Sequence, residues 1–153
     1  MSARLLLIPC LLLLAFSARA ASESGVFKGT GSYTNADQIS AEAVSISVSL
    51  TLTASAFTIH DCWTSSNQQD PICYDSNYKV DDNQQVFSNG VKIGDIYPGY
   101  VVLFTSNDQV SEQMIFNFDT DDISSAQSLR YIYTLVSYDG VSEGRRGQLQ
   151  RSP

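Results

Sequence analysis

The chain has 153 residues, 43% of them hydrophobic, and its 16 acidic and 9 basic residues give a formal net charge of −7. Proteins that bind nucleic acid or anionic membrane surfaces present a basic field, so this balance argues against both partners. The length suits one domain with a hydrophobic core, and no linker or internal repeat divides it.

The first 20 residues have the pattern of a Sec-type signal peptide. Arg4 supplies the basic start, Leu5 to Phe16 are apolar, and Ala18-Arg19-Ala20 provides the small residues that signal peptidase requires. The apolar stretch is shorter than the roughly 20 residues of a transmembrane helix. We therefore expect cleavage after Ala20, one domain over residues 21–153, a secreted or periplasmic protein and no transmembrane segment after cleavage. Loss of Arg4 and Arg19 would change the formal charge from −7 to −9.

The rest of the sequence alternates short β-rich runs with turn residues. Val44 to Thr53 is the clearest strand, because apolar and hydroxyl residues alternate with period two. Asn89-Gly90 is a strong hairpin signal, and Pro98-Gly99 marks another turn. Further strands are expected at Gly25–Thr34, Ala56–Trp63, Cys73–Val80, Gln84–Asn89, Val91–Tyr97, Tyr100–Ser106, Glu112–Phe118, Leu129–Tyr138 and Gly144–Arg151.

Many sequential strands joined by tight turns predict an all-β fold. We expect a single up-and-down antiparallel β-barrel of about 8–10 strands, with a β-sandwich as the alternative. Closing the sheet removes the exposed edges that so many strands would otherwise present. A membrane barrel is disfavoured because the closing strand, Gly144–Arg151, carries three arginines and only Leu149 as an apolar residue.

The first strand has the form Gly-x-aromatic-x-Gly-x-Gly, with Gly25, Phe27, Gly29 and Gly31, and the chain closes with "GQLQR". In this respect it resembles the lipocalin-like (calycin) barrels, and especially their nitrobindin-like and fatty-acid-binding members. The resemblance implies that Phe27 plugs the barrel base. Nitrobindin-like barrels bind haem through a late histidine, which this chain lacks. Fatty-acid-binding members hold a carboxylate with interior arginines, and Arg130 is the candidate here, with an exposed position as the alternative.

The segment His60 to Asp75 holds the only histidine and tryptophan and two of the three cysteines. Once the signal peptide is removed, Cys62 and Cys73 are the only cysteines left, at the facing ends of a predicted hairpin. An oxidising compartment then favours a disulfide between them, which stabilises by roughly 3 kcal/mol on the chain-entropy model. The bridge leaves His60 no thiol with which to share a metal, and we expect the histidine to be exposed.

Asp61 is the unexpected residue of this segment, because alternation places it on the apolar face with Trp63. We expect the Asp61 carboxylate either to be hydrated at the barrel rim or to accept a hydrogen bond from inside the barrel. Asp61 and Trp63 are therefore the first pair to mutate in a search for a ligand. Tyrosine rings offer an apolar body with one polar group, which suits the lining of a mouth; ordinary cross-strand packing is the alternative. The full set of predicted ligand-binding residues is Asp61, Trp63, Tyr97, Tyr100, Phe116, Arg130, Tyr131 and Tyr133.

Catalytic and metal-binding motifs are missing from the sequence. It has no His-Glu-x-x-His, paired Cys-x-x-Cys or Gly-x-Ser-x-Gly pattern, so we assign no catalytic residue, metal ligand or cofactor. The acidic loops Asp81–Asn83 and Asp119–Asp122 lack the spacing of an EF-hand and are expected to be solvated turns.

Two functions remain from the sequence. The first is a non-catalytic binding protein for a small hydrophobic molecule, for which an open cavity above ~300 Å³ would be evidence. The second is an extracellular protein-interaction module whose core is filled by Phe104, Phe116, Phe118 and Leu135.

Overall fold

The computed structural model describes residues 22–36, 40–140 and 142–153. These residues form ten strands and no helix. The predicted signal peptide and its cleavage site lie outside them. The strands are β1 (Glu23–Asn35), β2 (Glu42–Leu52), β3 (Ala56–Ser65), β4 (Ile72–Val80), β5 (Gln85–Ser88), β6 (Val91–Tyr97), β7 (Tyr100–Ser106), β8 (Val110–Phe118), β9 (Ser128–Ser137) and β10 (Ser142–Arg151).

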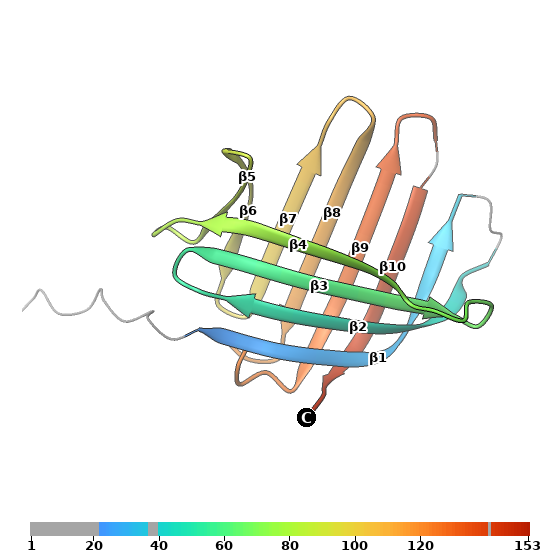
Figure 1. Ribbon diagram of the computed structural model, residues 1–153, viewed down its shortest axis with the longest axis horizontal. Coiled ribbons are helices and arrows are strands. Elements are labelled where there is room, and N and C mark those ends of the chain that lie inside the picture. Colours follow the sequence, from blue (N-terminus) through green and yellow to red (C-terminus); the bar gives the residue numbers. More distant parts are fainter. Residues whose placement is uncertain (1–21, 37–39, 141) are drawn as a thin grey trace, which may run out of the picture.

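Each strand pairs antiparallel with the next along the chain, and β1 pairs with β10, so the sheet closes into a single up-and-down barrel. This confirms the predicted fold and excludes the sandwich. In Figure 1, β1 to β4 cross in front of β7 to β10 at a steep angle. The end of β1 turns upward to run beside β10, so that β1 takes part in both layers.

The bend of β1 depends on a glycine. A Cβ built on Gly31 would lie 2.4 Å from the carbonyl oxygen of Arg146 on β10 and 2.5 Å from the Ile46 side chain. Contacts this short do not occur, so any other residue would push the two strands apart. The first-strand glycine noted in the sequence therefore has a steric role in barrel closure.

The barrel interior is filled by side chains. The Phe116 ring packs between Phe57 and Tyr131, with centroids 6.0 and 5.6 Å away. Two hollows border inner residues. One has a volume of about 10 Å³, near the lower limit for holding a single water molecule. The other is too small to hold any water molecule. Every strand contributes buried residues to the core, and in β2 these are the alternate positions that its period-two pattern predicts.

The base of the barrel is closed by the segment between β8 and β9. Ile123 and Ala126 of this segment are buried, and Arg151 at the end of β10 donates hydrogen bonds to both carbonyl oxygens. The Arg151 guanidinium also lies 5.2 Å from the centre of the Phe27 ring. Phe27 is therefore part of the closed base, in agreement with the role that the family resemblance implies.

One core prediction is wrong. Phe104 is 53% exposed, because Val101 and Leu103 occupy the inner positions of β7 and alternation turns Phe104 outward. The run Tyr100–Ser106 is apolar on both faces, so its pattern does not indicate which residues face the core. Among the described residues, no helix is long and apolar enough to cross a membrane.

Candidate binding site at the barrel mouth

A buried ionic cluster lies at the end of the barrel opposite the base. Asp61 of β3 points inward and is only 2% exposed. Its Oδ2 is 3.0 Å from Nη1 of Arg145 on β10 and accepts a 2.7 Å hydrogen bond from the hydroxyl of Tyr131 on β9. Side chains from β3 and from the distant strands β9 and β10 thus meet at one carboxylate oxygen.

The other oxygen of this carboxylate is unsatisfied. Asp61 Oδ1 is fully buried and has no hydrogen-bond partner among the described residues. A buried carboxylate oxygen without a donor is costly, so such groups commonly mark a site for water or a ligand. Burial raises the pKa of Asp61, against the opposing effects of the Arg145 charge and the Tyr131 hydrogen bond.

Aromatic rings surround the Arg145 guanidinium. Its carbon atom Cζ lies 4.1 Å from the centre of the Tyr133 ring, 5.6 Å from Trp63 and 5.7 Å from Tyr74. Trp63 is in turn stacked on Tyr33, with centroids 4.6 Å apart. Cation–π contacts of this kind stabilise a guanidinium that is removed from water.

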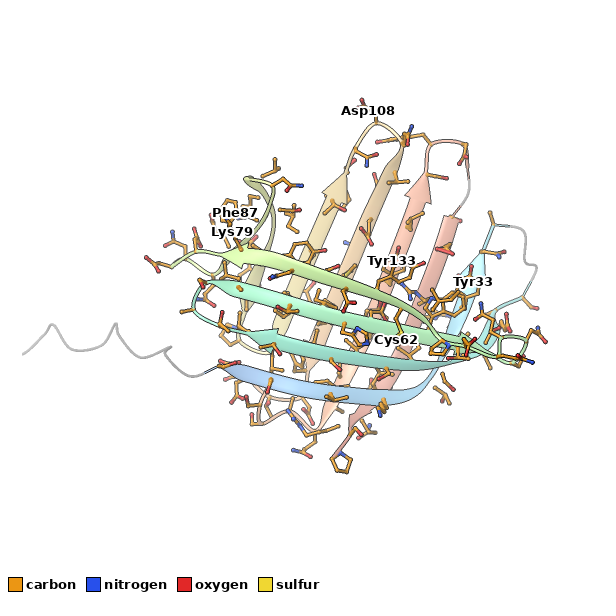
Figure 2. All side chains as sticks on the ribbon, viewed as in Figure 1. Tyr33, Cys62, Lys79, Phe87, Asp108 and Tyr133 are labelled. Carbon is orange, nitrogen blue, oxygen red and sulfur yellow. A yellow bond between two sulfur atoms is a disulfide. The ribbon has the colours of Figure 1, made fainter. Side chains whose placement is uncertain are left out.

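Tyr74 lies between this cluster and solvent. The register of β3 and β4 places Tyr74 opposite Asp61 on the inner face, yet Tyr74 is 54% exposed. A residue that faces inward and is still half exposed marks the mouth of the barrel. Figure 2 labels Tyr33 and Tyr133, which lie on the side of the molecule where β1 ends and β10 begins.

Two half-buried carboxylates flank this mouth. Glu143 accepts a 2.8 Å hydrogen bond from the hydroxyl of Tyr33, and Glu112 accepts one of 3.3 Å from Thr105. Burial, together with the Glu112 carboxylate, raises the pKa of Tyr133. The mouth is therefore lined by aromatic rings and carries more acidic than basic groups.

The predicted ligand-binding residues fall into three groups. Asp61, Trp63, Tyr131 and Tyr133 come together in the mouth cluster, and Phe116 packs beneath it against Tyr131. Arg130 lies on the outer face of β9 and is exposed. Of the two positions expected for it, the exposed one is therefore correct. Tyr97 and Tyr100 lie near the base, at the β6–β7 turn, with their ring centroids 6.3 Å apart.

Sequence reasoning missed Arg145, Tyr33 and Tyr74. The signal for Arg145 was available, because alternation along β10 puts it on the same face as Leu149, the one apolar residue of that strand. Tyr74 follows Cys73 in the predicted returning strand, and the β3–β4 ladder places it opposite Asp61.

A shallow groove of about 1010 Å³ lies on the outer face of β1, β9 and β10. Outward-facing side chains line it, among them Arg130, Ile132, Arg146 and Gln148. The large hollow of this barrel is thus outside, whereas a carrier that encloses its ligand would need it inside.

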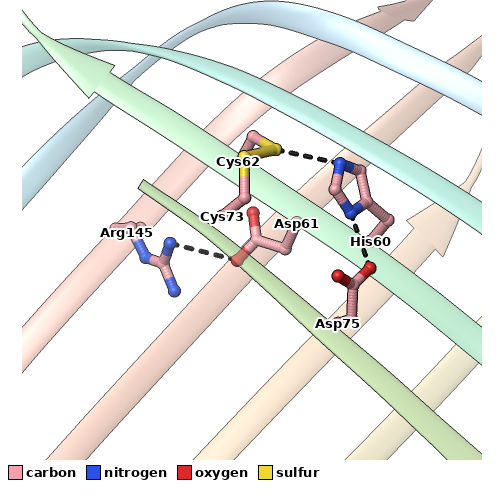
Figure 3. Close-up of a disulfide and its surroundings, with 6 residues drawn as sticks. All are labelled: His60, Asp61, Cys62, Cys73, Asp75 and Arg145. Carbon is pink, nitrogen blue, oxygen red and sulfur yellow. Dashed lines mark hydrogen bonds and ion pairs between the residues drawn. A yellow bond between two sulfur atoms is a disulfide. The ribbon is translucent and has the colours of Figure 1, made fainter. Parts of the chain in front are cut away.

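The predicted disulfide between Cys62 and Cys73 is confirmed, with a sulfur–sulfur distance of 2.10 Å. It lies on the outer face of β3 and β4. His60 is exposed there, as predicted, but it also contacts Asp75 and Cys62 (Figure 3).

The acidic loop after β8 acts as a set of turn-forming acceptors. The Asp119 carboxylate accepts hydrogen bonds from the backbone N–H groups of Gln127 and Ser128, which lower its pKa. Asp122 accepts from the N–H and hydroxyl of Ser125, with the same effect. Both carboxylates have the structural use expected of solvated turn residues.

Fold and site together define a closed ten-stranded antiparallel barrel with an aromatic mouth, an architecture consistent with the calycin or lipocalin-like barrels. Comparisons with protein-family models, curated proteins and solved structures find no match. The disulfide is compatible with a location outside the cytoplasm.

Proposed function

We propose that this chain is an extracytoplasmic, non-catalytic protein that binds a small amphipathic molecule at the mouth of its barrel. The observation that carries the proposal is the buried Asp61–Arg145 pair, which is ringed by aromatic side chains, one of which, Tyr74, is half exposed to solvent. Concave, mainly apolar sites with a few placed polar groups are typical of small-ligand binding.

The ligand binds at the rim and does not enter the barrel. Phe57, Phe116 and Tyr131 fill the interior below the cluster, and the inner hollow near the base is about 10 Å³. A ligand that is enclosed in the manner of a carrier would need ~300 Å³ or more. In this proposal a flat apolar body lies against the half-exposed ring of Tyr74, which does not require the core to open.

Charge narrows the class of ligand further. Arg145 is already paired with Asp61, whereas Glu112 and Glu143 lie half-buried around it. A carboxylate ligand would be repelled by the two glutamates, so we propose a neutral or cationic ligand. Its hydrogen-bond donors would pair with these carboxylates.

Two measurements test the proposal. Native mass spectrometry of protein purified from its own host should detect a bound small molecule. Titration with neutral, cationic and anionic aromatic compounds should change the fluorescence of Trp63, the only tryptophan and a contact of Arg145. We expect responses from the neutral or cationic probes and none from the anionic ones.

A pair of tyrosine variants localises the site. Tyr74→Ala should abolish the fluorescence response, whereas Tyr97→Ala should not, because Tyr97 is equally exposed (52%) but lies near the base. Equal responses from the two variants, or no bound molecule together with no response to any probe, would refute binding at the mouth.

A second candidate is binding of a protein partner on the outer face of β1, β9 and β10. It is supported by the groove of about 1010 Å³ and by Arg130 and Arg146 within it. Replacing both arginines with glutamate should abolish a co-purifying polypeptide and leave the Trp63 response unchanged. A partner that still binds this variant would refute the groove as the interface.

A further inference from the structure

The outer face of β3 and β4 carries a chain of reactive groups that the mouth site does not use. Cys62 and Cys73 are directly opposed in the β3–β4 ladder, and His60 and Asp75 form the opposed pair two residues further along. On the other side of β3, Ser47 and Ser49 of β2 lie opposite Cys62 and His60. Asp75 is therefore the charged group that faces His60 from its two neighbouring strands.

The two ring nitrogens of His60 contact different partners. Nδ1 lies 2.7 Å from Asp75 Oδ1, and Nε2 lies 3.1 Å from the sulfur of Cys62 (Figure 3). A carboxylate and a disulfide sulfur are both acceptors, so the imidazolium, which carries a proton on each nitrogen, satisfies both contacts. The arrangement aims a proton at one sulfur of the disulfide.

The same groups are accessible from solvent. The side chains of His60 and Asp75 are 46% and 82% exposed, and Cys73 is more exposed than Cys62. An incoming thiol can therefore reach Cys73, while the sulfur that must leave lies beside His60.

We propose that Cys62–Cys73 is a thiol-exchange site in which His60 is the proton donor and Asp75 positions it. A thiolate of an external dithiol attacks Cys73 Sγ. The Cys73–Cys62 bond breaks, its electron pair stays on Cys62, and that sulfur takes the Nε2 proton of His60. The second thiol of the reductant loses its proton to solvent and attacks the mixed disulfide as a thiolate. Cys73 leaves as a thiolate and is protonated by solvent, His60 regains its proton from solvent, and the reductant is left as a disulfide.

A proton donor at Cys62 is useful because this sulfur must leave as a thiolate. Thiolate departure is faster when the developing charge on sulfur is neutralised, and positioned general acids commonly accelerate such steps by about 10²–10⁴-fold. A bridge with a purely structural role needs neither a proton donor at one sulfur nor a carboxylate to hold that donor. The inference does not depend on the proposed ligand site, which lies on the inner face.

The test compares rates of disulfide reduction in the folded protein. Oxidised wild type, His60→Gln, Asp75→Asn and Ser49→Ala are treated with dithiothreitol, the free thiols are trapped by alkylation, and the reduced fraction is followed by mass. We expect His60→Gln to react about 100-fold more slowly or more and Asp75→Asn to be slowed by a smaller factor. Ser49→Ala, at the position opposite His60 on β2, should match wild type.

The pH profile separates proton donation from a packing effect. The ratio of the wild-type rate to the His60→Gln rate should fall toward unity as pH rises, because the neutral imidazole whose Nδ1–H faces Asp75 has no proton on Nε2. The ionisation of dithiothreitol affects both proteins alike and cancels in the ratio. His60→Asn takes the place of the glutamine variant if the latter does not fold. Rates within twofold of wild type at every pH, or a ratio that does not change with pH, would overturn the proposal.

Discussion

Replacing Arg145 with methionine should leave the buried Asp61 carboxylate without its cation. Methionine keeps much of the volume between the rings of Trp63 and Tyr133, so the main change is electrostatic. Removing one partner of a buried ion pair typically costs 3–5 kcal/mol, roughly a third of the stability of an average domain. For a domain of this size that corresponds to a decrease in Tm of about 10–15 °C.

The same variant should show a characteristic dependence on pH. Burial already raises the pKa of Asp61 in the folded protein, and loss of the Arg145 charge removes an attraction that lowers this pKa. Between the unfolded value of about 3.9 and this raised pKa, the folded state binds more protons than the unfolded state. The free energy of unfolding of Arg145→Met should therefore decrease as pH rises through this window and be largest on its acidic side.

Urea unfolding followed by Trp63 fluorescence and circular dichroism, over a series of pH values, measures both effects. The control is the double variant Asp61→Asn/Arg145→Met, in which neither charge remains. It should recover most of the lost stability at neutral pH and lose the pH dependence of the single variant. A loss below about 1 kcal/mol for Arg145→Met, or a loss that does not change with pH, would show that the pair is not held as a buried ionic contact.

Three further outcomes are expected. Gly31→Ala should destabilise by about 2 kcal/mol or more, because its Cβ meets the Arg146 carbonyl; an unchanged Tm would contradict this steric role. Asp119→Asn should flatten the acid side of the stability profile: the pKa of Asp119 is lowered, so its contribution is present above about pH 4 and is lost as pH falls through the folded pKa. Urea titrations at several pH values measure the stability of both proteins. An acid side of the profile identical to that of wild type would show that the Asp119 carboxylate does not stabilise the turn. Phe104→Ser should change stability by less than about 0.5 kcal/mol and increase solubility, whereas a large loss would mean that the ring is buried against a partner.

The sequence was sufficient for the strands and for part of the site. Asp61 was identified because it alternates in phase with Phe57, Ile59 and Trp63, and that parity depends only on local backbone geometry. The same reasoning left Arg130 open. Its strand is apolar on both faces, so only the packing of Tyr131 against Phe116 decides which face is interior.

The cation of the cluster could not be assigned from local pattern. Arg145 and Arg146 are adjacent arginines in a strand with one apolar residue, and one lies inside the barrel while the other lies in the outer groove. The partner of Arg145 is Asp61, 84 residues earlier in the chain. Bringing the two together requires barrel closure between β1 and β10, which is a long-range property of the register.

The single histidine, the single tryptophan and the paired cysteines, which lie close together in sequence, belong to two sites because β3 is pleated. Successive side chains of a strand point to opposite faces, so His60 and Cys62 lie outside and Asp61 and Trp63 lie inside. The disulfide is one pair from the end of the β3–β4 ladder, which continues through seven pairs from Cys62 to Ala56. Thiol exchange on the outer face can therefore proceed while this ladder keeps the mouth intact, so the two sites can be altered one at a time.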